Sequence, residues 1–92
     1  MQYLYVTWEH NFEDEPKEFY MELNEERFQE RVLEIFEDGK IAYATSNQEF
    51  NTFLAKEDYP CIEEINSMEE FRARLITKEE FEKIWEEKVT KK

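Results

Sequence analysis

The fold of this chain is decided by the stretch Leu33-Glu34-Ile35-Phe36-Glu37-Asp38-Gly39-Lys40-Ile41-Ala42-Tyr43-Ala44-Thr45. The Asp38-Gly39 pair stands between two apolar runs, and it is typical of a tight hairpin turn because both residues tolerate positive φ. Without this pair, residues 28–36 are ambiguous, since their apolar positions fit a helical stripe as well as a strand. We therefore predict a β-hairpin made of residues 28–36 and 40–45.

Two further strands are expected before this hairpin. In residues 2–10, Leu4, Val6 and Trp8 alternate with Tyr3, Tyr5 and Thr7, so both faces are partly apolar and a central strand is favoured over an edge strand. Residues 17–23 alternate in the same way, and Pro16 excludes a central strand at the point just before them.

The second half of the chain contains weaker signals until its last helix. Residues 46–59 are expected to be irregular and pinned to the core by apolar side chains. Pro60 suits the first position of a short helix. Ser67 with Glu70 fits the cap of another helical turn, and Cys61 between its neighbours is interpreted as a small buried hydrophobe.

The last helix has the clearest pattern in the chain. Thr77 and Glu80 form a capping-box pattern, and one apolar stripe follows it. The stripe consists of Phe81, Ile84, Trp85 and Val89. Strands first and helices last indicate a single α+β domain, residues 1–92, in which an antiparallel sheet of about four strands carries the C-terminal helices on one face.

The amino-acid composition of the chain excludes several classes of function. The chain has 92 residues, 24 acidic against 12 basic side chains, a formal net charge of -12 and a pI of about 4.5. Direct binding to nucleic acid or to an anionic membrane needs a basic surface, which this composition does not offer. Disorder is opposed by 40% hydrophobic and 16% aromatic residues, so a folded domain is expected.

The sequence predicts no cofactor and no metal. Gly39 is the only glycine, which removes phosphate-binding glycine loops, and one Cys with one His gives no metal-ligand spacing. Cys61 has no partner for an internal disulfide, so a reducing compartment is expected. No apolar run approaches the ~20 residues of a membrane span and no signal-peptide pattern is present, so we expect a cytoplasmic protein.

His10 allows two interpretations. It follows the first strand and precedes Glu13, Asp14 and Glu15, so it is a candidate general base or metal ligand with those carboxylates. The structural interpretation, which the weak pattern favours, is a histidine that ties the end of the strand to the acidic loop by a hydrogen bond.

The negative charge is concentrated in one part of the chain. Residues 1–50 hold 13 acidic and 4 basic side chains, and within residues 9–26 Lys17 is the only basic residue before Arg27. The acids of that segment are Glu9, Glu13, Asp14, Glu15, Glu18, Glu22, Glu25 and Glu26. Aromatic side chains among charged ones are typical of an interface with electrostatically steered association. A strongly basic protein is the partner expected.

The residues expected to bind that partner come from the acidic segment and from the irregular region after the hairpin. They are His10, Phe12, Glu13, Asp14, Glu15, Glu18, Tyr20, Glu22, Phe50 and Phe53.

The order of several short motifs resembles a family of small bacterial proteins of uncharacterised domain. The motifs are Trp8-x-His10, Glu13-Asp14-Glu15-Pro16, Glu34-Ile35-Phe36-x-Asp38-Gly39-Lys40-x-x-Tyr43-Ala44, Ile62-Glu63-Glu64-Ile65-Asn66 and Thr77-Lys78-Glu79-Glu80-Phe81-x-x-Ile84-Trp85. The resemblance implies no catalytic residue. By analogy it places the chain among small acidic proteins that include immunity proteins of toxin systems.

Three functions follow as hypotheses. The first is a non-catalytic immunity protein that neutralises a basic bacterial toxin such as a nuclease. The second is a nucleic-acid mimic that inhibits a DNA- or RNA-binding protein, which requires carboxylates at regular, phosphate-like spacing. The third is a small enzyme or ligand-binding domain that uses His10 with nearby carboxylates.

Overall fold

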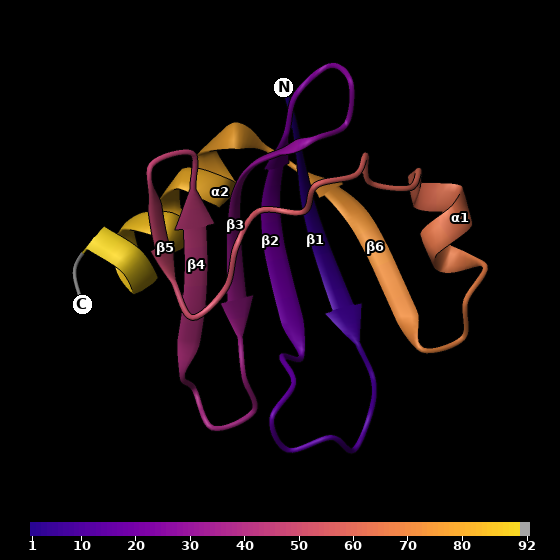
Figure 1. Ribbon diagram of the computed structural model, residues 1–92. Coiled ribbons are helices and arrows are strands. Elements are labelled where there is room, and N and C mark those ends of the chain that lie inside the picture. The colour runs from indigo at the N-terminus through magenta and orange to yellow at the C-terminus, as the bar shows by residue number, and fades with distance from the viewer. Residues whose placement is uncertain (91–92) are drawn as a thin grey trace.

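The computed structural model describes residues 1–90, which form one six-stranded antiparallel sheet with two short helices (Figure 1). The strand order across the sheet is β5-β4-β3-β2-β1-β6. The strands are β1 (Gln2–Trp8), β2 (Glu18–Leu23), β3 (Gln29–Ile35), β4 (Ile41–Thr45), β5 (Gln48–Phe50) and β6 (Phe71–Ile76). The helices are α1 (Ile62–Asn66) and α2 (Lys78–Trp85), and α2 continues as a π-helical segment, η1 (Glu86–Thr90).

The antiparallel α+β architecture and the four predicted strands are confirmed, but the sheet has six strands and not about four. β1 lies inside the sheet between β2 and β6, as its two apolar faces indicated. The two missed strands are its edges. β5 has only three residues, all exposed, which is too short for an alternating pattern to register. β6 pairs with β1 over Phe71–Ile76, where the capping pattern of Ser67 and Glu70 had indicated a helical turn.

The β3–β4 hairpin forms where Asp38-Gly39 predicts it, although only the glycine adopts positive φ, at 88°. The Gly39 amide donates to Phe36 O at 2.9 Å, and the Phe36 amide donates to Lys40 O at 2.9 Å. The connection is therefore longer than two residues, with its left-handed position at the glycine, where a side chain would be strained.

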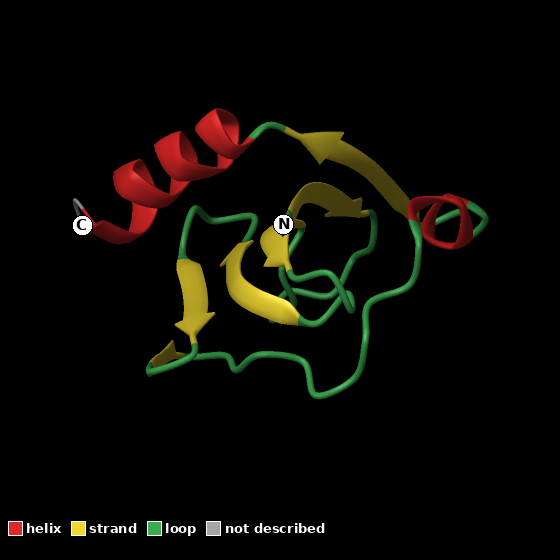
Figure 2. Cartoon of the chain, turned by 90° about the horizontal axis from the view of Figure 1, so that it is seen from above, coloured by secondary structure: helices red, strands yellow, loops and turns green. Residues whose placement is uncertain are grey.

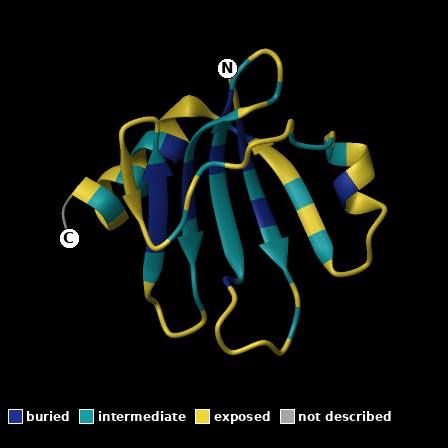
Figure 3. Ribbon diagram, in the orientation of Figure 1, coloured by how far each residue is buried: buried dark blue, intermediate teal, exposed yellow. Residues whose placement is uncertain are grey.

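The two faces of the sheet carry separate apolar clusters. Face 1 is the side with Leu4 and Val6, and face 2 is the side with Tyr3 and Tyr5. The face 1 cluster is completed by α1 and by residues 51–61, which cross this side of the sheet (Figure 2). Its buried members are Leu4, Val6, Met21, Leu23, Val32, Ala44 and Ile65. Figure 3 shows that the buried residues lie mainly in the inner strands.

On face 2 the sheet is covered by α2, whose Phe81 is fully buried beside Tyr3 and Ile76. The predicted capping box is present: Thr77 Oγ1 accepts from the Glu80 amide at 3.1 Å, and Glu80 Oε1 accepts from the Thr77 amide at 3.1 Å. This cap starts the helix directly after β6 and turns the chain back across the sheet.

Three expectations about the helices are wrong. The helices lie on opposite faces, because Ile65 of α1 joins the face 1 cluster while Phe81 of α2 joins the face 2 cluster. Pro60 lies before the helix, since Cys61 is the N-cap residue of α1. Cys61 is exposed and not buried, because it precedes α1 as its N-cap and the helix buries Ile65 instead.

Candidate functional site: the β1–β2 loop and the open part of face 2

The β1–β2 loop, residues 9–17, is organised around the ring of His10. His10 Nδ1 accepts from the Phe12 amide at 2.9 Å, and Nε2 lies 2.8 Å from the carbonyl oxygen of Pro16. Since an amide must donate, Nδ1 is unprotonated and Nε2 carries the hydrogen that it donates to Pro16 O. Both ring nitrogens are therefore engaged by the backbone, as in the structural interpretation, and neither offers a free lone pair to a substrate or metal.

Lys17 holds the other end of the same loop. Its Nζ donates to His10 O and lies 4.0 Å from a carboxylate oxygen of Glu37. Its amide donates to Ile35 O at 2.9 Å, and its carbonyl accepts from the Trp8 amide at 2.9 Å. The loop is thus fixed to both neighbouring strands by backbone and side-chain hydrogen bonds.

Aromatic rings gather at the start of this loop. The Trp8 ring lies 4.2 Å from the His10 ring and 5.5 Å from the Phe71 ring, measured between centroids. Phe12 stacks on His10 at 5.3 Å, yet 60% of its surface is exposed. The predicted anchor Phe12 is therefore presented to solvent from a rigid base.

The acidic triplet (Glu13, Asp14 and Glu15) forms the tip of the loop and is exposed. None of its carboxylates forms an ion pair within residues 1–90. The neighbouring β3–β4 turn, which carries Glu37 and Asp38, lies beside it at the same end of the sheet (Figure 1). In the described part of the chain, no three or more His, Cys, Asp or Glu side chains come together in a way that could hold a metal ion.

Glu18 and Tyr20 lie on face 2, in the part that α2 leaves open. The Tyr5 hydroxyl donates to Glu18 Oε1 at 2.7 Å, and the Tyr5 and Tyr20 rings are 4.7 Å apart. Burial and this hydrogen bond raise the pKa of Tyr5, so it remains a phenol at neutral pH.

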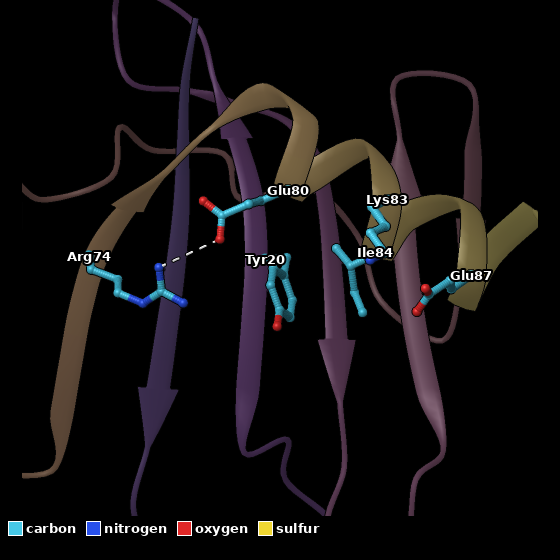
Figure 4. Close-up of a pocket in the computed structure, with 6 residues that line it drawn as sticks. All are labelled: Tyr20, Arg74, Glu80, Lys83, Ile84 and Glu87. Atoms are coloured by element: carbon cyan, nitrogen blue, oxygen red, sulfur yellow. Dashed lines mark ion pairs between the residues drawn. The ribbon is translucent and has the colours of Figure 1, made fainter.

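Where this open part of face 2 meets the side of α2, the surface forms a shallow hollow of about 360 Å³ (Figure 4). It is lined by Tyr20, Arg74, Glu80, Lys83, Ile84 and Glu87. The Arg74 guanidinium lies 5.0 Å from the Tyr5 ring centroid and 3.9 Å from Glu80. The lining thus mixes both charge signs over an aromatic floor. Arg74 was not among the predicted site residues, although the alternation of Phe71-Arg72-Ala73-Arg74 favours a strand at this position.

Glu22, in contrast, belongs to the packing of α2. Its side chain is 12% exposed, and its carboxylate binds Arg31 at 2.8 Å. Burial raises the pKa of Glu22, but the hydrogen bond and charge of Arg31 outweigh burial and leave the pKa below its ordinary value. This carboxylate is therefore already paired with Arg31 within the chain.

Phe50 and Phe53 are separated from the loop. Phe50 lies on β5, its ring 5.4 Å from that of Tyr43, and β4 and β3 stand between it and β2. Phe53 follows β5 and is 64% exposed. The ten residues predicted from sequence therefore lie in three places. Most belong to the β1–β2 loop and the adjacent part of face 2, Glu22 lies beside Arg31 under α2, and Phe50 and Phe53 lie at the β5 edge of the sheet.

The fold and the site define a small acidic α+β protein in which an acidic loop, hydrogen-bonded at both of its ends, extends from one end of the sheet. A family model described as a domain of unknown function, DUF6881, matches residues 2–90, and the chain belongs to this family. No curated protein and no solved structure shows significant similarity to it. Within residues 1–90, no helix combines the length and apolar character needed to cross a bilayer.

Proposed function

We propose that this chain is a non-catalytic protein-binding module whose β1–β2 loop binds a strongly basic partner, as an immunity protein binds and inhibits a cognate toxin such as a nuclease. The observation that carries the proposal is the combination of an unpaired acidic triplet with the exposed Phe12 on a loop fixed by His10 and Lys17. A loop that served only solubility has no need of such fixation.

Rigidity matters because association loses the freedom of every group that must be ordered. In this loop that ordering is already present in the free protein, through the hydrogen bonds of His10 and Lys17. The acidic triplet would accelerate encounter with a basic surface, and Phe12 would supply a buried anchor near the centre of the contact.

The test is binding to the product of the adjacent gene, measured by stopped-flow association and titration calorimetry at two salt concentrations. Replacing the acidic triplet with lysines is expected to slow association at least tenfold and to reduce its salt dependence. Phe12→Ala is expected to weaken affinity about tenfold, mainly through faster dissociation.

The matched control replaces Glu57, Asp58 and Glu69 with lysines, which changes the net charge by the same amount at exposed positions outside the loop. If association of this control variant slows as much as that of the loop variant, net charge and not the loop determines binding. If neither variant changes association, the loop is not the binding surface.

A further inference from the structure

The hydrogen bond from the Phe12 amide to His10 Nδ1 exists only while the imidazole is neutral. The 2.9 Å contact needs a lone pair on Nδ1, because the amide can only donate. A protonated imidazole carries hydrogens on both nitrogens. Its Nε2 hydrogen still bonds Pro16 O, but its Nδ1 hydrogen would point at the Phe12 N–H.

The two ends of the loop would respond differently to that protonation. The His10 and Trp8 ring centroids are 4.2 Å apart, and an imidazolium is attracted to an indole ring. Protonation is therefore expected to leave the His10 ring in place beside Trp8. The Phe12 amide loses its hydrogen bond to this ring. The Phe12 ring still stacks on His10 at 5.3 Å between centroids, but it is 60% exposed, whereas Trp8 also packs against Phe71. Residues 11–15 are therefore the part that is released.

The charged groups on the elements around the ring are predominantly acidic. They are Glu9, Glu13, Asp14, Glu15 and Lys17 in the loop, Glu18 on β2, Glu37, Asp38 and Lys40 at the β3–β4 turn, and Glu70 and Arg72 at the start of β6. In the structure the Phe12 amide donates to His10 Nδ1.

We propose that His10 is an acid-sensitive latch: its protonation frees the Phe12 amide, releases the acidic triplet from its fixed position and thereby weakens binding of the basic partner. The last step rests on the proposed function, whereas the release of the loop does not.

The loop step is tested by NMR on the full chain, in which His10 is the only histidine, so its ring signals are unambiguous. The Phe12 amide shift is expected to follow the imidazole titration. Its exchange rate, relative to the intrinsic rate at the same pH, is expected to rise roughly tenfold as the ring protonates, as for the loss of one hydrogen bond. A Phe12 amide that keeps its protection while the ring is protonated overturns the latch.

His10→Asn is the matched variant, because an asparagine oxygen accepts from the amide two residues on without titrating. Its Phe12 amide is expected to stay constant between pH 5 and 8, and the same transition in this variant would contradict the proposal. A second variant, with amides in place of the acidic triplet, is expected to keep the transition. If it abolishes the transition, the carboxylates and not His10 are responsible.

The binding step is measured at pH 7.5 and 5.5 with the adjacent gene product and with a short oligolysine probe. The wild type is expected to lose about tenfold in affinity at the lower pH, while His10→Asn does not. Equal affinities of the wild type at both pH values overturn the regulatory step. Absence of binding at either pH contradicts the proposed function instead, and the NMR result still decides the latch.

Discussion

Arg31 on β3 donates two hydrogen bonds to the carboxylate of Glu82 on α2, with Nη1–Oε1 and Nη2–Oε2 distances of 3.2 and 2.6 Å. The same guanidinium binds Glu22 on β2 and lies 4.7 Å from the Phe81 ring centroid. A single cation thus joins two strands to the helix that covers face 2.

Removing this cation is expected to loosen α2. Arg31→Ala leaves the carboxylate of Glu22 without this partner on a side chain that is only 12% exposed, so we expect the free energy of unfolding to fall by about 2–4 kcal/mol in urea denaturation. Glu82→Gln is the control, because Glu82 is 43% exposed and its loss is expected to cost less than ~1 kcal/mol. Equal losses in the two variants would show that Arg31 contributes no more than a surface ion pair.

Glu34 on β3 gives the stability of the fold a component that depends on pH. Burial raises the pKa of Glu34, and the hydrogen bond from Thr52 Oγ1 at 3.1 Å offsets this only in part. The folded state therefore favours the protonated carboxyl, so the stability it contributes is present below the ordinary value of 4.5 and is lost as pH rises through the folded pKa.

Glu34→Gln is accordingly expected to raise the unfolding temperature at pH 7, because it removes a half-buried charge and keeps an acceptor for Thr52. The difference from the wild type should disappear as the pH falls below about 4. Thermal unfolding followed by circular dichroism across this range checks it, with exposed Glu13→Gln as the control. A variant that is less stable than the wild type at pH 7 would contradict the assignment.

Patterns among neighbouring residues were sufficient to predict four of the six strands of the sheet. The hairpin at Gly39 and the capping box of Thr77 depend on neighbouring residues alone, and both are confirmed. β6 was missed because the capping pattern of Ser67 and Glu70 competed with the alternation of Phe71-Arg72-Ala73-Arg74, and pairing with β1 decided between them. Since β1 is far from β6 in the sequence, no pattern among neighbouring residues predicts that pairing.

The candidate site was predictable where it is continuous in sequence. His10, Phe12 and the acidic triplet belong to one loop, so their proximity follows from the chain itself. The ion pair of Glu22 was not predicted, because its partner Arg31 and its neighbour Glu82 come from two other elements. Tyr5 and Arg74 become neighbours only through the unpredicted strand β6.

Arg27 fixes the segment that crosses face 1. Its guanidinium donates to Tyr59 O at 2.9 Å and to Pro60 O at 2.7 Å, while its own backbone adopts the left-handed region with φ of 69°. Arg27→Ala is expected to lower the free energy of unfolding by about 2–3 kcal/mol, because two carbonyls lose a charged donor.

Arg27→Gly separates the side chain from the backbone at this position. Glycine loses the same hydrogen bonds but adopts positive φ without strain, so it is expected to be about 1 kcal/mol more stable than the alanine variant. Urea denaturation of both variants measures the difference. A glycine variant no more stable than the alanine variant would show that the left-handed conformation carries no strain here.

Asn66 at the end of α1 blocks the outer edge of the sheet. Its Nδ2 donates to Ala73 O at 3.0 Å and its Oδ1 accepts from the Ala73 amide at 2.7 Å, so both outward-facing backbone groups of β6 at this position are occupied. An unblocked edge strand is a template for pairing with another chain. Asn66→Ala is expected to cost about 1–2 kcal/mol of stability and to expose this edge.

Pairing between copies of the variant is opposed by the net charge of -12, so self-association should appear only when salt screens that repulsion. Light scattering with size-exclusion chromatography at low and high salt is the measurement. Asn66→Asp is the control, because it keeps the acceptor for the Ala73 amide and adds a charge at the edge, which disfavours strand pairing. If Asn66→Ala remains monomeric at high salt while its stability falls, Asn66 holds α1 in place and does not protect the edge.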